Sequence, residues 1–233
     1  RDIGVTGVQT CALPIYVSWR TISHNGTAMW HDHRIHWMSP STPAVIDAEG
    51  TVQHWTLTLV VDGTSHTVAG TLYLRGHHSV LWWFTGLVGA MTAAFLAVRS
   101  RKRFYASLTW VAALGTVTGL LQWLSLPSAA RVTPLMLMFG IGALIAANVG
   151  MVLHRHTDRG PQMEWIASSM SAGSGAAMLL AAWMSWQQVQ SAYVPMIGPA
   201  WVARTTVTTL LGAGVVAVVD GVLRAVRVQP NPD

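Results

Sequence analysis

The residues best suited to chemistry lie in one short segment, Trp30 to Met38, which reads Trp-His-Asp-His-Arg-Ile-His-Trp-Met. On an extended strand, side chains two residues apart point to the same face, so the imidazoles of His31 and His33 could reach one ion. Neutral imidazole binds copper, zinc and nickel, and the thioether of Met29 or Met38 would add a soft ligand that suits copper. We therefore predict a transition-metal site here, with copper as the metal that these donors favour.

The third histidine of the segment, His36, has the wrong parity for the same face. It joins the site only if a bulge or turn near Ile35 reorients it. A His-x-His pair is also a weaker pattern than a complete zinc spacing, and a structural interpretation competes with metal binding. In that interpretation the histidines bond to the backbone and the remaining motif residues organise the domain: Trp30, Asp32, Arg34, Trp37 and Met38.

Residues 1–15 resemble the translation of a sequencing-library adapter. We therefore expect the native sequence to begin near Tyr16 and its own N-terminus to be missing. The single cysteine, Cys11, lies within this stretch. The native protein is then expected to have no disulfide, no thiolate nucleophile and no cysteine ligand. No serine or paired carboxylate completes a catalytic constellation either, so we predict that the protein is not an enzyme.

The composition indicates an integral membrane protein. Hydrophobic residues make up 52% of the 233 residues and charged residues only 10%, which is too apolar for an ordinary soluble domain. The formal net charge of +5 does not indicate a nucleic-acid partner, because the basic residues lie in short loops between apolar runs. The predicted partner is the lipid bilayer.

Residues 16–78 have the pattern of a β-domain. Between Val52 and Val61 apolar side chains alternate with polar ones, as in a half-buried strand. The pair Asp62-Gly63 suits a tight hairpin turn, and Val68 to Leu74 is the predicted returning strand. Because an immunoglobulin-sized sandwich needs about 100 residues, we predict only the C-terminal portion of an antiparallel β-sandwich.

Residues 79–227 contain five apolar stretches, each near the about 20 residues that a helix needs to cross a bilayer. The predicted spans are Val80–Val98, Tyr105–Leu126, Leu135–Leu153, Trp165–Trp186 and Thr206–Val226. A short tail, residues 228–233, follows them. The predicted fold class is therefore mixed, with a partial extracytoplasmic β-sandwich followed by an all-α transmembrane bundle of five helices.

The basic residues are divided unequally between the two sets of loops. Those after the first, third and fifth spans are Arg99, Arg101, Lys102, Arg103, Arg155, Arg159, Arg224 and Arg227. The alternate loops carry only Arg131 and Arg204. The positive-inside rule then predicts a multi-pass protein of the plasma membrane, with the β-domain outside and the C-terminus in the cytoplasm.

The predicted spans contain few groups that indicate transport. Asp220 lies four residues before Arg224, so an i,i+4 ion pair explains it, with a proton-path role as the alternative. Glycines in the spans are expected to let helices approach closely. They are Gly115, Gly119, Gly140, Gly142, Gly173, Gly175, Gly212 and Gly214. Five spans without charges or interruptions at matching positions of two halves argue against a coupled transporter.

The motif also carries a resemblance to a family. The run Trp30-His31-Asp32-His33-Arg34-x-His36-Trp37-Met38, with Trp19-Arg20 before it and Val61-Asp62-Gly63 after it, resembles uncharacterised actinobacterial membrane proteins. The resemblance implies a secreted-side β-domain, several spans, a short cytoplasmic tail and a cell-envelope location. It implies no activity. Ile35 stands where the pattern of the family would have threonine.

Together these observations predict a membrane protein of the cell envelope that binds copper or another transition metal through His31 and His33, with His36 as a conditional ligand. A first alternative is a structural, sensory or protein-interaction role, in which the motif only organises the β-domain and its contact with an envelope protein partner. A second alternative is a transporter or channel subunit.

Overall fold

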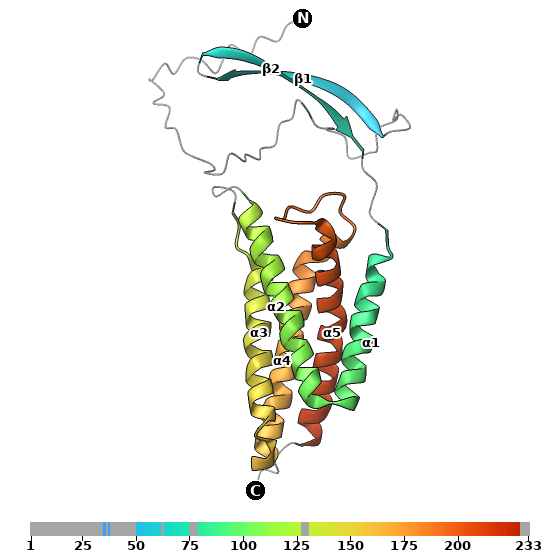
Figure 1. Ribbon diagram of the computed structural model, residues 1–233, viewed down its shortest axis with the longest axis vertical. Helices are drawn as coiled ribbons and strands as arrows, with labels where there is room; N and C mark the ends of the chain where they lie inside the picture. Colours follow the sequence, from blue (N-terminus) through green and yellow to red (C-terminus); the bar gives the residue numbers. More distant parts are fainter. Residues whose placement is uncertain are drawn as a thin grey trace, which may run out of the picture.

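The structure is a computed structural model, and it describes residues 35, 37, 50–61, 63–74, 79–126 and 131–228. Within these ranges the chain forms a β-hairpin followed by a bundle of five long helices (Figure 1). The long elements are β1 (Thr51–Val61), β2 (Thr64–Tyr73), α1 (Trp82–Arg99), α2 (Arg101–Ser125), α3 (Leu135–His154), α4 (Pro161–Ser185) and α5 (Ala200–Arg227). Two short 3-10 helices flank α4, namely η2 (Thr157–Arg159) and η3 (Trp186–Val189).

The hairpin confirms the predicted strand alternation. β1 and β2 pair antiparallel with Leu57 opposite Val68, and Leu57 is buried while Thr56 and Thr58 on the other face are exposed. Gly63 has a φ of 77°, the left-handed conformation that a tight turn requires. β2 begins at Thr64, four residues before the predicted start. The described residues show this two-stranded sheet, and the larger sandwich stays a prediction.

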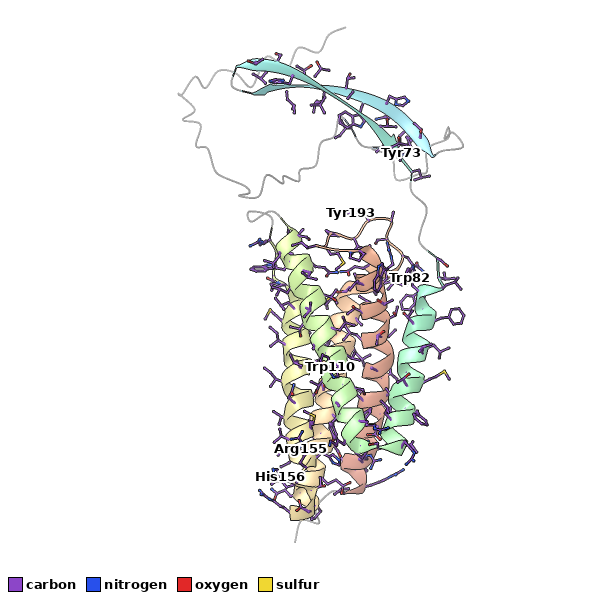
Figure 2. All side chains as sticks on the ribbon, viewed as in Figure 1. Tyr73, Trp82, Trp110, Arg155, His156 and Tyr193 are labelled. Atoms are coloured by element: carbon purple, nitrogen blue, oxygen red, sulfur yellow. The ribbon has the colours of Figure 1, made fainter. Side chains whose placement is uncertain are left out.

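The five helices run alternately up and down, so their ends form two opposite sides of the bundle (Figure 1). We call the side where α1 begins the proximal end and the opposite side the distal end. Trp82 and Tyr193 mark the proximal end, and Arg155 and His156 mark the distal end (Figure 2). α5 packs against α1, α2 and α4, and α3 packs against α2 and α4. The buried core between the helices includes Phe104.

Close packing in the bundle depends on some of the predicted glycines. A Cβ atom at Gly175 would lie 2.6 Å from the carbonyl oxygen of Gly214, and a Cβ at Gly212 would collide with the backbone of Gly86. These glycines therefore let α4 and α1 each touch the backbone of α5. The prediction is wrong for Gly142 and Gly173, because a Cβ at either position would have no neighbour within 4 Å in the described part of the chain.

The prediction of five spans is confirmed at the level of length and composition, since all five helices are long and apolar enough to cross a membrane. The helix ends differ from the apolar stretches. α5 begins at Ala200, six residues before the predicted Thr206, because the helix continues past the apolar stretch and starts directly after Pro199. Arg204 is therefore not a loop residue as predicted; it lies in the second turn of α5 and is buried.

Candidate functional site

The residues of the predicted metal site lie outside the described residues. These are His31, His33 and His36, together with the motif residues Trp30, Asp32, Arg34 and Met38. Of the same segment, Ile35 is described as half-buried and Trp37 as exposed. The metal site and the structural alternative therefore both stay predictions.

Two further histidines, His54 and His66, lie on the hairpin. The Nδ1 atom of His54 is 3.0 Å from the hydroxyl oxygen of Thr71, the residue directly opposite it. His66 lies opposite Leu59 and shares its face of the sheet. Leu59 is five residues after His54 on β1, so it faces the other way. The two imidazoles therefore occupy opposite faces of the sheet and do not converge. Among the residues that the structure describes, no three His, Cys, Asp or Glu side chains are grouped to hold a metal ion.

The most connected polar site in the described chain is a group of three charged side chains at the distal end. We call Arg101, Asp220 and Arg224 the distal charge cluster. Nη1 of Arg101 donates to Oδ2 of Asp220 over 2.6 Å, and Nε of Arg224 donates to Oδ1 over 3.1 Å. The side chains of Arg101 and Asp220 are each only 18% exposed, which weakens screening by solvent. Both carboxylate oxygens of Asp220 therefore accept a hydrogen bond from an arginine.

Aromatic contacts extend the distal charge cluster to two more helices. The guanidinium of Arg101 lies 5.0 Å from the ring centre of Phe104 and 5.4 Å from that of Tyr105. The Tyr105 hydroxyl donates to the carbonyl oxygen of Ala167 over 3.0 Å. The Tyr105 ring stacks on His154 with 5.2 Å between ring centres. Because these residues belong to α2, α3 and α4, and Asp220 belongs to α5, the cluster joins four helices at one end.

A small polar cavity of about 100 Å³ opens beside the cluster. Its walls are formed by Arg101, Tyr105, His154, Thr157, Glu164, Ala167, Ser168 and Arg224. The positive charges along its wall are matched by Glu164 and by the carboxylate of Asp220, each oxygen of which accepts one bond from an arginine. This arrangement suits a structural clamp that holds the helix ends together.

The sequence predicted one of the two ion pairs in this cluster. The predicted Asp220–Arg224 pair is confirmed as an i,i+4 ion pair. Sequence reasoning missed Arg101, which lies 119 residues away from Asp220 in the chain. The only sequence signal was the basic run that contains Arg101, and that run was attributed to membrane orientation alone.

Uncharged polar groups of the bundle also form hydrogen bonds between elements, and Gln122 is one of them. Its amide nitrogen donates to the side-chain oxygen of Gln188, and the reciprocal bond spans 3.3 Å. The hydroxyl of Ser174 donates to the carbonyl oxygen of Ala143 over 2.9 Å. Asn148 instead bonds to a carbonyl of its own helix. These bonds satisfy polar groups that would otherwise be costly in an apolar environment.

The five long apolar helices are compatible with an integral, multi-pass membrane protein in a lipid bilayer. The sequence matches no protein-family model, no curated protein and no solved structure.

Proposed function

We propose that this protein is a non-enzymatic, multi-pass protein of the plasma membrane that binds a transition metal, copper by preference, on an extracytoplasmic β-domain. The observation that carries the proposal is the spacing of His31 and His33 in a segment that also contains His36 and Met38. Imidazole and thioether donors fit copper in either common oxidation state, whereas the segment offers only one carboxylate to a harder ion.

Copper titration of the full-length chain in lipid nanodiscs tests this proposal. We expect stoichiometric binding, weakened at least about tenfold by His33→Ala, because losing a ligand costs at least as much as losing the partner of a ligand. His156→Ala at the distal end is the matched control and should bind as the parent does. Binding no tighter than that of a scrambled histidine peptide would overturn the proposal and favour the structural or partner-binding alternative.

The proposed orientation is supported by the distribution of charge in the folded bundle. The distal end carries Arg99, Arg101, Lys102, Arg103, Arg155, Arg159, Arg224 and Arg227, whereas the proximal end of the described chain carries Arg131 and Arg204. By the positive-inside rule the distal end is cytoplasmic and the proximal end, which leads to the hairpin, is outside.

Cysteine labelling checks this orientation. In a Cys11→Ser background, Tyr193→Cys places a thiol in the exposed loop at the proximal end, and Asp158→Cys places one at an exposed position of the distal end. A membrane-impermeant maleimide should label Tyr193→Cys on intact cells and Asp158→Cys only after permeabilisation. The reverse pattern would place the hairpin in the cytoplasm and remove the case for an extracytoplasmic metal site.

A further inference from the structure

Arg204 is a buried cation whose charge the described bundle does not balance. The residue is only 4% exposed, although it lies in a helix apolar enough to cross a membrane. The described acidic residues are Asp158, Glu164 and Asp220, and all three lie at the distal end, opposite Arg204. A buried charge without a counter-charge is costly, and such residues within spans are usually functional.

The bonds that Arg204 makes are incomplete. Nη2 donates to the carbonyl oxygen of Ser191 over 2.9 Å, and the guanidinium lies 6.0 Å from the ring centre of Trp82. Nε is buried and has no hydrogen-bond partner among the residues that the structure describes. Unpaired buried donors are uncommon and call for an explanation such as a bound ion or ligand. An anion beside the guanidinium would supply both the missing acceptor and the missing negative charge.

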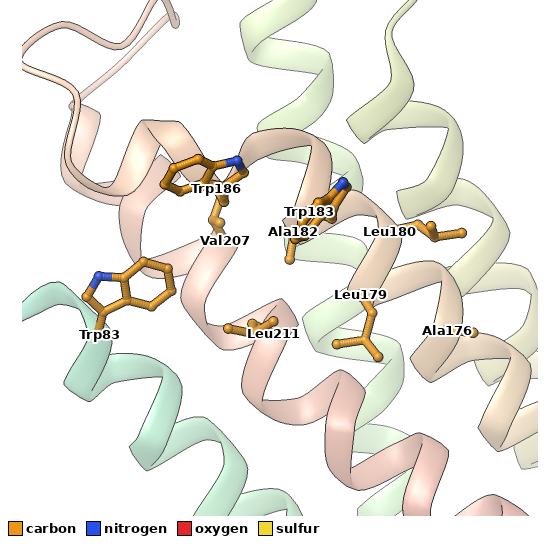
Figure 3. A pocket seen from close by; sticks show the side chains of 9 residues that line it. All are labelled: Trp83, Ala176, Leu179, Leu180, Ala182, Trp183, Trp186, Val207 and Leu211. Atoms are coloured by element: carbon orange, nitrogen blue, oxygen red, sulfur yellow. The ribbon is translucent and has the colours of Figure 1, made fainter.

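An apolar groove lies one turn along α5 from Arg204; Arg204 is not itself a lining residue, and the first residue of α5 that lines the groove is Val207. The groove has a volume of about 660 Å³, within the range of about 300–1,000 Å³ that is common for ligand sites. Trp83 of α1 lies on one side and Trp183 of α4 on the other, Val207 and Leu211 of α5 lie between them, and Trp186 of η3 lies above Val207 in the view of Figure 3. Its lining is almost entirely apolar, which suits a hydrocarbon chain.

Three connections place Arg204 at the proximal end of this groove. Arg204 precedes Val207 by three residues and Leu211 by seven, so all three share one stripe of α5. The ring below the guanidinium, Trp82, is the direct neighbour of the groove residue Trp83. The acceptor Ser191 lies in the segment that follows η3. A ligand with an anionic head and an apolar tail would therefore place its head at Arg204 and its tail in the groove.

We propose that Arg204 and the groove form a binding site for an anionic phospholipid, with the phosphate at Arg204 and one acyl chain along Trp83, Val207 and Leu211. A bilayer offers such lipids at this position, because the tryptophans near the groove entrance mark the interfacial region where head groups lie. Arginine suits the phosphate because its planar fork of donors fits phosphate oxygens. The lipid plays no role in metal binding, so this site is independent of the metal site proposed above.

Lipid retention by the delipidated, full-length protein tests the site. Native mass spectrometry is carried out after adding phosphatidylglycerol or phosphatidylcholine with the same acyl chains. We expect at least about fivefold higher retention of phosphatidylglycerol, and loss of that preference in Arg204→Gln. Arg131→Gln is the matched control, because Arg131 is an exposed arginine of the same end that lies over Trp123.

A second variant separates the tail from the head group. Ala176→Trp fills the groove from α4 without altering Arg204, so it should reduce retention of both lipids, and it keeps the test decisive if Arg204→Gln does not fold. Equal retention of the two lipids by the parent protein, or unchanged retention in Ala176→Trp, would overturn the proposal. Inorganic phosphate should compete at the head-group position. We expect it to abolish the preference for phosphatidylglycerol without releasing phosphatidylcholine. If phosphate has no effect at any soluble concentration, the lipid phosphate does not contact Arg204.

Discussion

Gly175→Val is expected to destabilise the bundle by about 3 kcal/mol, at the upper end of the usual cost of overpacking. A Cβ atom at this position would lie 2.6 Å from the carbonyl oxygen of Gly214 and 2.8 Å from the amide nitrogen of Val218. Both atoms belong to the backbone of α5 and cannot rotate away as a side chain can. The two helices must move apart, and the packing that van der Waals contact provides in a membrane is lost along the interface.

Gly173→Val provides the matched control for this change. The two glycines lie in the same helix, but a Cβ at Gly173 would have none of the described residues within 4 Å. We expect its effect to stay within about 0.5 kcal/mol, as for other substitutions away from packed features. Reversible unfolding in mixed micelles measures both variants. If the two variants lose the same free energy of unfolding, close contact with α5 is not what requires glycine at position 175.

The difference between these two glycines also shows where sequence reasoning stops in a membrane bundle. Small residues in a span predict close packing, and both Gly173 and Gly175 satisfied that rule. A separation of two residues on a helix corresponds to a rotation of about 200°, so Gly173 and Gly175 must lie on nearly opposite sides of α4. Which side faces α5 depends on the arrangement of all five helices, and apolar side chains on both faces hide that information.

The helices were predictable because crossing a bilayer requires a minimum apolar length, which leaves a strong local pattern. Their ends were less predictable. Hydropathy identifies the part of a helix that matches the hydrocarbon layer, whereas the helix itself continues through polar and charged residues. For α5 this difference moved Arg204 from a predicted loop into the buried bundle, and the proposed lipid site depends on that position.

The hairpin illustrates the same limit for strands. The alternation of apolar and polar residues predicted β1, because that pattern is typical of a half-buried strand. The first four residues of β2, Thr64 to Thr67, have no apolar side chain, so a hydrophobic pattern could not include them. Their pairing is instead fixed by the turn, which places Thr64 opposite Val61 and thereby sets the register of the hairpin as far as Gln53, beyond which the pairing shifts.

Asp220→Ala should have the second large effect, a loss of about 2 kcal/mol in the free energy of unfolding. Removing one partner of a buried ion pair typically costs about 3–5 kcal/mol, and partial exposure reduces that cost. The variant leaves Arg101 and Arg224 next to each other without the carboxylate that both contact. It also releases the start of α2 from the end of α5. Asp158→Ala, an exposed acidic residue of the same end, is the control and should change stability little.

A double-mutant cycle distinguishes the clamp between helices from the local pair within α5. If Arg101 holds Asp220 across the bundle, combining Arg101→Ala with Asp220→Ala should cost less than the sum of the two single changes, by about 1 kcal/mol. The bond between Nη1 and Oδ2 is the shorter of the two bonds to Asp220, at 2.6 Å. The coupling to Arg101 should therefore exceed the coupling to Arg224, whose i,i+4 pair on a helix is worth about 0.2–0.5 kcal/mol. Additive effects of Arg101→Ala and Asp220→Ala would show that the contact between α2 and α5 contributes nothing to stability.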